Sequence, residues 1–290
     1  GAKGGQEPIG SLIVMERFPS PHGAEPKAII AVGQLSCDTV VTLDGPLAAR
    51  DHNPGSALSM PGGTAAIVAH NVAALGGRPV FTGQVGDGIE DQNAARALRD
   101  AGVALGPLTR TSRGLRVVIV VEPDGERTMF AAGDPPSWGG LELPARLGDI
   151  VFFEGWHLLG EAPDADYIAL IRQASNRGAV VALDVCTTNN AGSSHRELLA
   201  DLPIDILLAN SVEADALGLL SAPTSPVVIV HRGCEPTVLL MGSEQREFPV
   251  DMVTPVDTSG AGDTFAAGFL LAIQNSATTE DAVRCGLAAA

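Results

Sequence analysis

A run of small and acidic residues near the end of the chain, Asp257 to Leu270, has the types and spacing to handle a phosphate group. Gly260, Ala261 and Gly262 leave backbone N–H groups uncovered, and an apolar stretch with helical spacing follows them. A helix start adds unpaired N–H donors and the positive end of its dipole, so the sequence predicts an anion site here. Asp263 lies at the mouth of this anion site, where a bound anion would repel its carboxylate. A role as the base that takes a proton from an attacking hydroxyl would explain an acidic residue at this place.

A plainer interpretation fits an isolated motif of this kind. Asp263 would cap the helix, and Gly260 and Gly262 would be ordinary turn residues. The dinucleotide fingerprint G-x-G-x-x-G fails, because position 265 is Phe and the motif lies near the end of the chain. The rest of the chain must decide between a cap and a base.

Composition excludes several classes of protein. The 290 residues suffice for one large domain, or one plus a small appendage. A formal charge of −16 disfavours a nucleic-acid or anionic-membrane partner, and no apolar run reaches the roughly 18 residues of a membrane span. The four isolated cysteines suggest neither a zinc site nor disulfides. We therefore expect a cytoplasmic protein with no nucleic-acid or membrane partner.

Lysine usage is more restrictive still. The only lysines are Lys3 and Lys27, both in the N-terminal extension. The body of the chain therefore lacks a lysine for a Walker A loop, a protein-kinase strand or a Schiff base. No H-E-x-x-H or G-x-S-x-G occurs either. Any phosphate transfer must depend on backbone amides, arginine and metal.

The elements that would position this chemistry follow a β-α rhythm. Residues 1–27 are rich in Gly, Pro and Ser and are predicted to be a flexible tail. Apolar runs that suit doubly covered parallel strands then alternate with helical stretches. They are residues 28–32, 80–84, 150–153, 179–183, 205–209, 227–230 and 253–256, with a second hairpin at 238–241 and 246–250. Residues 115–121 and 126–131, joined by Pro123-Asp124-Gly125, form a hairpin that interrupts the series as a lid would.

Two further polar positions follow predicted strands. Asp38 lies just beyond the first strand, where open α/β sheets bind ligands, although such a residue is more often part of a turn. Asn210 closes a later strand and Glu213 follows three residues on, which resembles a capping box. A capped helix start can still direct Glu213 toward a hydrated metal ion.

The segment D-T-S-G-A-G-D at 257–263 resembles the signature D-T-x-G-A-G-D of the ribokinase-like (PfkB) carbohydrate kinases. Other landmarks of that family occur in order upstream: Asp38, Gly62-Gly63 followed by Leu75-Gly76, the hairpin, and N-x-x-E at 210–213. The resemblance covers residues 28–290. It implies an α/β fold, a ribokinase-like three-layer sandwich with a mostly parallel central sheet. A small β-sheet lid would come from about residues 38–61 and 113–132.

The resemblance also implies roles for individual residues. A small sugar or polyol would contact Asp38, Gly62, Gly63, Ile67, Trp156 and, from the lid base, Arg116, although an arginine on a strand is more often solvated. ATP would contact Asn210, Glu213, Gly233, Thr258, Gly260 and Gly262. Asn210 and Glu213 would hold Mg²⁺ through water, and Asp257 would serve a K⁺ site. A homodimer through the lid is left open.

The implied reaction is in-line attack of a substrate hydroxyl on the γ-phosphate of ATP. Asp263 would accept the proton, and the Gly260–Gly262 amides would form the anion hole. With an ordinary pKa of about 3.9, Asp263 would be ionised and a weak base. A loose transition state demands no more.

Departures from the family pattern keep other functions open. Ile67 stands where the family carries Asn, and Asn71, one turn later, would replace it only in part. His231 replaces the Thr of a T-x-G segment, and Thr64, in place of a lysine, argues against a phosphorylated substrate. A nucleoside kinase and a catalytically silent ligand-binding relative remain alternatives. A Rossmann-type oxidoreductase is disfavoured by the missing early glycine fingerprint.

Overall fold

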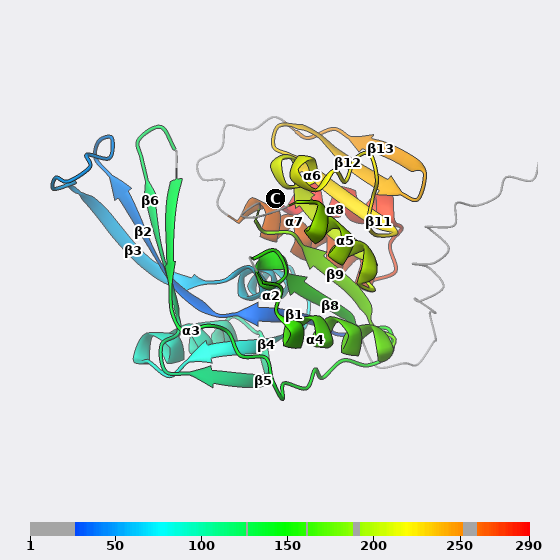
Figure 1. Cartoon of the computed structure of the whole chain (residues 1–290), viewed down its shortest axis with the longest axis horizontal. Coiled ribbons are helices and arrows are strands. Elements are labelled where there is room, and N and C mark those ends of the chain that lie inside the picture. The colour runs from blue at the N-terminus through cyan, green and yellow to red at the C-terminus, as the bar shows by residue number, and fades with distance from the viewer. Residues whose placement is uncertain (1–26, 126, 161, 188–191, 252–259) are drawn as a thin grey trace, which may run out of the picture.

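The computed structural model describes residues 27–125, 127–160, 162–187, 192–251 and 260–290. In this part of the chain a nine-stranded sheet is layered between helices, and a separate four-stranded sheet projects from one side (Figure 1). This arrangement confirms the predicted three-layer α/β fold with a second, smaller sheet. None of the described helices is long and apolar enough to cross a membrane.

The large sheet has the strand order β13-β12-β11-β10-β9-β8-β1-β4-β5. Neighbours from β11 to β5 pair in parallel, whereas β12 and β13 are added antiparallel as a hairpin. The strands are β1 (Ile29–Gln34), β4 (Pro79–Gly86), β5 (Ala104–Thr111), β8 (Ile150–Glu154), β9 (Val180–Asp184), β10 (Ile206–Asn210), β11 (Val227–Arg232), β12 (Glu235–Met241) and β13 (Glu244–Phe248). The central strands read as continuous apolar runs because helices cover both of their faces.

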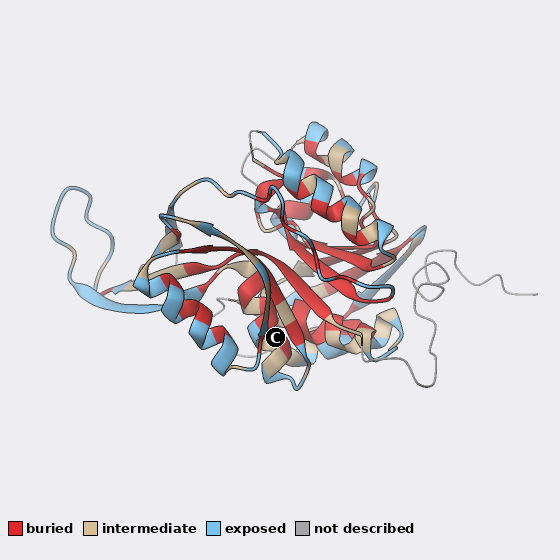
Figure 2. Ribbon diagram, turned by 90° about the horizontal axis from the view of Figure 1, so that it is seen from below, coloured by how far each residue is buried: buried red, intermediate tan, exposed pale blue. Residues whose placement is uncertain are grey.

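Two hydrophobic cores lie on the two faces of this sheet, and the buried sheet between its helices is visible in Figure 2. One core is closed by α2 (Thr64–Ala74), α3 (Ile89–Asp100), α7 (Ala261–Gln274) and α8 (Thr279–Ala289). The other is closed by α4 (Ala165–Asn176), α5 (Ser193–Asp201) and α6 (Ser211–Leu217). A short 3₁₀ helix, η1 (Gly155–His157), follows β8. The α2 and α7 helices share one face, so their N-terminal ends lie at the same edge of the sheet.

The small sheet has the order β3-β2-β6-β7. Its strands are β2 (Ser36–Leu43), β3 (Gly55–Gly62), β6 (Leu115–Val121) and β7 (Arg127–Ala132). The two hairpin arms, β2–β3 and β6–β7, are joined through parallel pairing of β2 with β6. The strands come from the two segments that the sequence assigns to a lid. Much of this sheet is exposed, in contrast to the large one (Figure 2).

Two details of the sequence interpretation change. Asp38 lies inside β2 rather than ahead of a strand. The pattern misses β5, because Gly106 and Pro107 interrupt its apolar run, although β5 pairs with β4 along the sheet edge. The predicted strand at 253–256 lies outside the described residues.

Candidate active site

The residues of the predicted anion site lie at the start of α7. Gly260 precedes the helix with φ 74°, a left-handed conformation that suits glycine. Its carbonyl oxygen accepts hydrogen bonds from the backbone N–H and the Oγ1 hydroxyl of Thr264, both at 2.8 Å. The first N–H groups of the helix have no acceptor within it. A Cβ on Gly262 would meet no atom of the described residues within 4 Å, so space is open beside Gly262 in this part of the chain.

Asp263 occupies the third position of α7, and its surroundings correct the expectation of an ordinary carboxyl group. Burial raises the pKa of Asp263 well above its usual range, and the nearby carboxylates of Asp184 and Glu154 raise it further. Among the described residues no donor makes a hydrogen bond to its carboxyl group. Asp263 is therefore a stronger base than an exposed aspartate, because its ionised form is less stabilised.

Helix α2 contributes the wall beside this site. A Cβ placed on Gly260 would lie 3.9 Å from Cγ2 of Ile67 and 3.8 Å from Oδ2 of Asp263, which puts the three residues next to one another. Asn71 donates from Nδ2 to Oγ1 of Thr264 at 3.0 Å. This amide thus joins α2 to α7. It contacts the helix rather than standing in for the missing amide at position 67.

Asp38 and the paired glycines form a second group at the base of the small sheet. The Ser36 hydroxyl donates to Oδ1 of Asp38 at 2.5 Å, and burial raises the pKa of Asp38. A Cβ on Gly62 would lie 2.0 Å from Oδ2 of Asp38, so only glycine leaves room for this carboxyl group. Gly63 has φ 95°, and a Cβ there would lie 2.1 Å from the carbonyl oxygen of Gln34.

Arg116 forms ion pairs with two acidic residues of α3. Its Nη1 and Nη2 donate to the two carboxylate oxygens of Asp91 at 2.6 and 2.9 Å, and its Nε donates to Glu90 at 3.2 Å. Asp91 is 1% exposed, so this bidentate pair fastens the start of β6 to α3. A substrate contact of Arg116 would have to compete with this pair. Arg113, at the same end of the lid, pairs with Asp134 at 2.7 Å.

Trp156 and His157 are neighbours in η1 and lie in different environments. Trp156 is 44% exposed, as a ligand-contacting side chain or a plain surface residue would be. His157 is buried, and its Nε2 lies 3.1 Å from Oε1 of Glu154. Glu154, the last residue of β8, is a buried carboxylate that the sequence patterns do not single out. The signal was available, since the residue ends a continuous apolar strand.

Asn210 and Glu213 form the capping box of α6. The Asn210 Oδ1 accepts from the Glu213 N–H at 2.9 Å, and Oε2 of Glu213 accepts from the Asn210 N–H at 2.8 Å. Burial, and then the charge of Asp184, raises the pKa of Glu213 to about 7. Burial also raises the pKa of Asp184 to about 6. The cap is therefore formed, and its carboxyl group lies close to a second one.

The turn after β11 holds Gly233 and leaves room around it. Gly233 has φ 62°, and a Cβ there would meet nothing within 4 Å. His231, the last residue but one of β11, lies beside Asn210, its register partner on β10. Its ring packs edge-on against Phe265 of α7 with centroids 4.2 Å apart, and burial lowers its pKa to about 4. His231 is thus a neutral side chain at ordinary pH.

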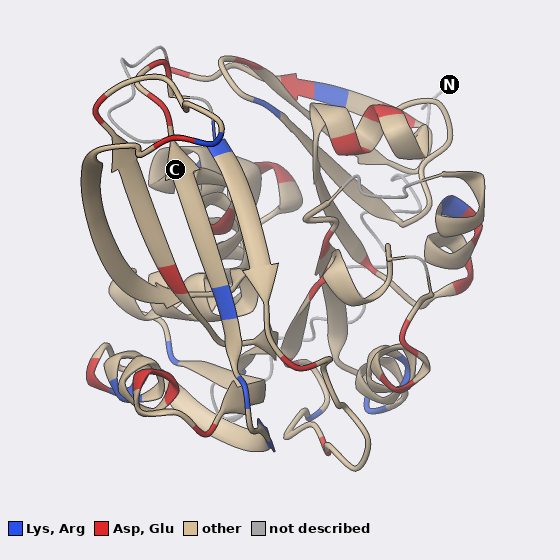
Figure 3. Ribbon diagram, turned by 60° about the vertical axis from the view of Figure 1, so that its left-hand side comes forward, with Lys and Arg blue, Asp and Glu red and all other residues tan. Residues whose placement is uncertain are grey.

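The carboxyl ends of the parallel strands bring the acidic groups together. Glu154 and Asp184 end β8 and β9, Glu213 follows β10, and all three interact electrostatically with one another or with Asp263. Figure 3 shows acidic positions at this edge, facing the small sheet. In the part of the chain described, no three His, Cys, Asp or Glu side chains are arranged to hold a metal ion by themselves. Asp257 and Thr258 lie outside the described residues.

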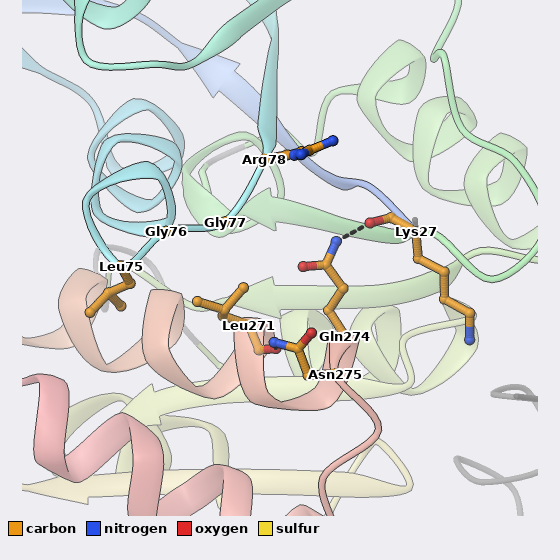
Figure 4. Close-up of a pocket in the computed structure, with 8 residues that line it drawn as sticks. All are labelled: Lys27, Leu75, Gly76, Gly77, Arg78, Leu271, Gln274 and Asn275. Atoms are coloured by element: carbon orange, nitrogen blue, oxygen red, sulfur yellow. Dashed lines mark hydrogen bonds between the residues drawn. The ribbon is translucent and has the colours of Figure 1, made fainter. Parts of the chain in front are cut away.

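A hollow of about 290 Å³ lies at the opposite edge of the large sheet (Figure 4). It is lined by Lys27, Leu75, Gly76, Gly77, Arg78, Leu271, Gln274 and Asn275. Lys27 and Arg78 precede β1 and β4, and Gln274 ends α7, where its side-chain amide donates to the Lys27 carbonyl. Asp263 lies at the start of α7 and Gln274 at its end, so the hollow is separate from the site at Asp263.

Comparisons with known proteins place the chain in a family. The model of the pfkB family of carbohydrate kinases matches residues 27–290. A cytidine kinase of Thermococcus kodakarensis is 25% identical over 89% of this chain and 93% of its own length. A fructokinase of Vibrio alginolyticus is 24% identical over 77% and 79%. The crystal structure of an adenosine kinase from Sinorhizobium meliloti, 24% identical, superimposes with a TM-score of 0.76 over 92% of this chain and 93% of that one. The chain therefore belongs to the pfkB family of carbohydrate kinases.

Proposed function

We propose that the protein transfers the γ-phosphate of ATP to a hydroxyl group of a small sugar or related polyol. The observation that carries the proposal is the start of α7. There, a partly buried carboxyl group with no hydrogen-bond donor among the described residues directly follows open backbone at Gly262. An anion bound by these amides would lie beside a base, as phosphate transfer to an alcohol requires.

Asp263 is proposed to accept the proton of the attacking hydroxyl. Its raised pKa makes it a better proton acceptor once ionised, and it must lose its own proton first. The N–H groups of Gly260, Ala261 and Gly262 would neutralise charge on the transferred phosphoryl group without moving. Asp38 would accept hydrogen bonds from neighbouring substrate hydroxyls beside Gly62 and Gly63.

Mg²⁺ is proposed to act through water, near Asn210 and Glu213. Glu213 is buried, and its raised pKa makes it responsive to a nearby cation, which favours the ionised form. In this proposal, phosphate oxygens and water complete the coordination of the ion. Mg²⁺ would supply charge neutralisation of the phosphates when bound. Gly233 and Thr258 are proposed for the nucleotide, and Asp257 for K⁺.

A nucleoside kinase is the second candidate, and the inner face of the small sheet favours it. Paired residues share a face of a sheet, so Met60 and Val117, the partners of Asp38, point to its side. The next row along that face is also apolar, with Leu58 and Ile119. Together with Ile67, this surface suits a base or an apolar substituent better than a plain sugar, and a cytidine kinase is among the relatives.

Two further proposals concern assembly and location. Met129 and Phe130 on the small sheet are more than half exposed, and we propose that a homodimer through this sheet covers part of that surface. Its measured mass in solution tests the idea. All four cysteines are free thiols, in keeping with a reduced cytoplasm as the compartment.

The decisive experiment is an ATP-turnover assay with Mg²⁺ across sugars, sugar acids and nucleosides. A supporting result is phosphorylation of at least one acceptor by wild type and its loss in Asp263→Asn. A ligand that shifts thermal stability without any turnover would favour a catalytically silent relative. A panel without turnover or any thermal shift from ATP analogues would contradict both readings.

A further inference from the structure

Glu154 accepts three hydrogen bonds from three different elements. Its Oε1 accepts from the N–H of Gln34 at 2.8 Å and lies 3.1 Å from Nε2 of His157, and its Oε2 accepts from the N–H of Ala65 at 3.1 Å. Because a carboxylate oxygen can only accept, Nε2 of His157 carries the proton. The group is 3% exposed, so water competes little with these bonds.

The surroundings leave Glu154 a single position. A Cβ on Gly33 would lie 2.4 Å from its carboxyl carbon, so glycine is needed for this close approach. Its own N–H donates to the Tyr167 hydroxyl at 3.1 Å, and that hydroxyl donates to the Val32 carbonyl at 2.9 Å. The His157 ring packs against both Trp138 and Tyr167, with centroids 4.8 and 4.7 Å away. Backbone and rings therefore fix both the carboxylate and its histidine partner.

The three donors belong to the three elements that carry the proposed polyol contacts. Gln34 ends β1 and leads directly into β2 with Asp38. Ala65 lies in the first turn of α2, between Gly62-Gly63 and Ile67. His157 lies in η1 beside Trp156. A shift of this one carboxylate would thus move all three elements relative to one another.

The charge of Glu154 also faces the proposed base. Among the described residues, the carboxylates of Glu154 and Asp184 both act on Asp263, and the neutral thiol of Cys186 lies near the same three groups. Burial is the larger cause of the raised pKa of Asp263, and the two negative charges add to it. Removal of one charge should therefore lower that pKa.

From this geometry we infer that Glu154 is a positioning residue. It holds Asp38, the Gly62-Gly63 turn and η1 in register with Asp263, and it maintains the negative potential at that base. The inference rests on the proposed phosphotransfer and assigns Glu154 a part in it without contact to the reacting atoms. A displacement of about 1 Å in such a frame can cost a large factor in rate.

Two substitutions separate position from charge. Glu154→Gln removes the charge and turns a donor toward one of the three N–H groups. Gly33→Ala keeps the charge and places a methyl group 2.4 Å from the carboxyl carbon of Glu154, so the carboxylate must leave its position; thermal unfolding of the variant checks that it still folds. Gly160→Ala is the matched control, because its added methyl group would meet nothing within 4 Å. Both test variants should lower kcat/KM for the polyol about tenfold or more, with KM for ATP within about twofold of wild type.

The pH dependence of kcat/KM is the decisive measurement, because a merely structural role of Glu154 would leave it unchanged. Asp263 must be ionised to act, so kcat/KM rises with pH through its pKa. In Glu154→Gln this acid limb should move to lower pH, whereas in Gly33→Ala it should stay closer to that of wild type.

Two substitutions of His157 provide an independent test. His157→Gln keeps an N–H donor for Glu154, and His157→Phe keeps a ring against Trp138 and Tyr167 without the donor. The inference predicts that the Gln variant retains more polyol kcat/KM, even where the Phe variant melts at the higher temperature. The opposite order in activity would overturn it.

The result that overturns the inference alone is clear. Folded Glu154→Gln and Gly33→Ala proteins would turn over the polyol within about twofold of wild type, while Asp263→Asn remains inactive. Equal losses toward ATP and polyol with an unmoved acid limb would also overturn it, since that pattern reports general damage. A wild-type protein without phosphotransfer to any acceptor would instead defeat the proposed function, and the inference with it.

Discussion

Helices α6 and α7 both carry an acidic residue at their third position, and the two carboxyl groups differ in what they contact. In α6, Glu213 bonds back to the N–H of Asn210 and closes a capping box. In α7, Asp263 follows Gly260, which has a left-handed conformation and no side chain to take part in a cap. The same local pattern therefore serves the backbone at one helix and leaves a carboxyl group available at the other.

The difference shows why a cap and a base are hard to tell apart from local pattern alone. Both carboxyl groups have raised pKa values, and burial is the first cause in each case. Glu213 has a backbone donor that partly offsets this, whereas Asp263 has only further negative charge nearby. A buried carboxyl group without a donor is costly, and a function is the usual reason to retain it.

The largest expected effect belongs to Asp263→Asn. If Asp263 is the base, kcat should fall about 10²-fold or more with nucleotide affinity unchanged. The fold should not be weakened, because the neutral amide avoids burial of a charge. Steady-state kinetics and calorimetric ATP binding check both parts. Near-normal turnover by the folded variant would show that Asp263 is not the base.

The next effect concerns substrate choice at Ile67, the apolar wall beside Gly260. An unpaired hydroxyl buried against it costs about 1–3 kcal/mol, so ribose and fructose should be poor acceptors relative to a deoxy sugar or nucleoside. Ile67→Asn should narrow that gap about tenfold, measured as a ratio of kcat/KM values. A wild-type kcat/KM for ribose or fructose of about 10⁴ M⁻¹s⁻¹ or higher would contradict this reading.

A matched glycine pair tests the open turn that separates α7 from α6. Gly260→Ala should lower stability by about 1–2 kcal/mol, because its φ of 74° is strained for any residue with a Cβ. Gly262→Ala has an ordinary helical position and open space, so its stability should be equal or slightly higher. Its methyl group would nevertheless narrow the space over the amides and weaken ATP binding. Chemical denaturation and ATP titration of both variants distinguish strain from a blocked anion site.

The smallest effect is expected for Glu213→Gln, and its sign depends on pH. The folded pKa of about 7 lies above the ordinary value of 4.5, so unfolding favours ionisation. The stabilisation that protonated Glu213 gives the folded wild-type protein is therefore fully present below about pH 4.5, and it is lost as the pH rises toward about 7. In Glu213→Gln the free energy of unfolding should depend less on pH. Loss of the Glu213 cap should also lower it by about 0.5–2 kcal/mol. Denaturation between pH 4 and 8 measures it.

Magnesium separates the two roles of Glu213 in the same variant. If the carboxylate acts through metal-bound water, the loss of kcat in Glu213→Gln should shrink as Mg²⁺ is raised. An unaltered Mg²⁺ dependence alongside lower stability would leave Glu213 as a cap only.

Local rules account for most of the fold. The apolar runs predict the central strands, the Asp124-Gly125 turn predicts the β6–β7 hairpin, and Asn210 with Glu213 predicts the capping box that the structure contains. The strand that the sequence pattern does not predict, β5, also has a local explanation. It contains Gly106 and Pro107, and it forms because β4 offers it an edge to pair with. A strand that depends on its neighbour carries a weak pattern of its own.

The sequence by itself determined the alternation of strands and helices, the glycine turn before α7 and the family motif around it, because these depend on residues close together in the chain. Only the tertiary structure decided that Arg116 pairs with Asp91, that Glu154 ties three elements together and that Asp263 has a raised pKa. Each of these depends on groups that lie tens of residues apart and meet only when the parallel strands end at one edge. Burial and electrostatic interaction act through space, and no spacing along the chain encodes them directly.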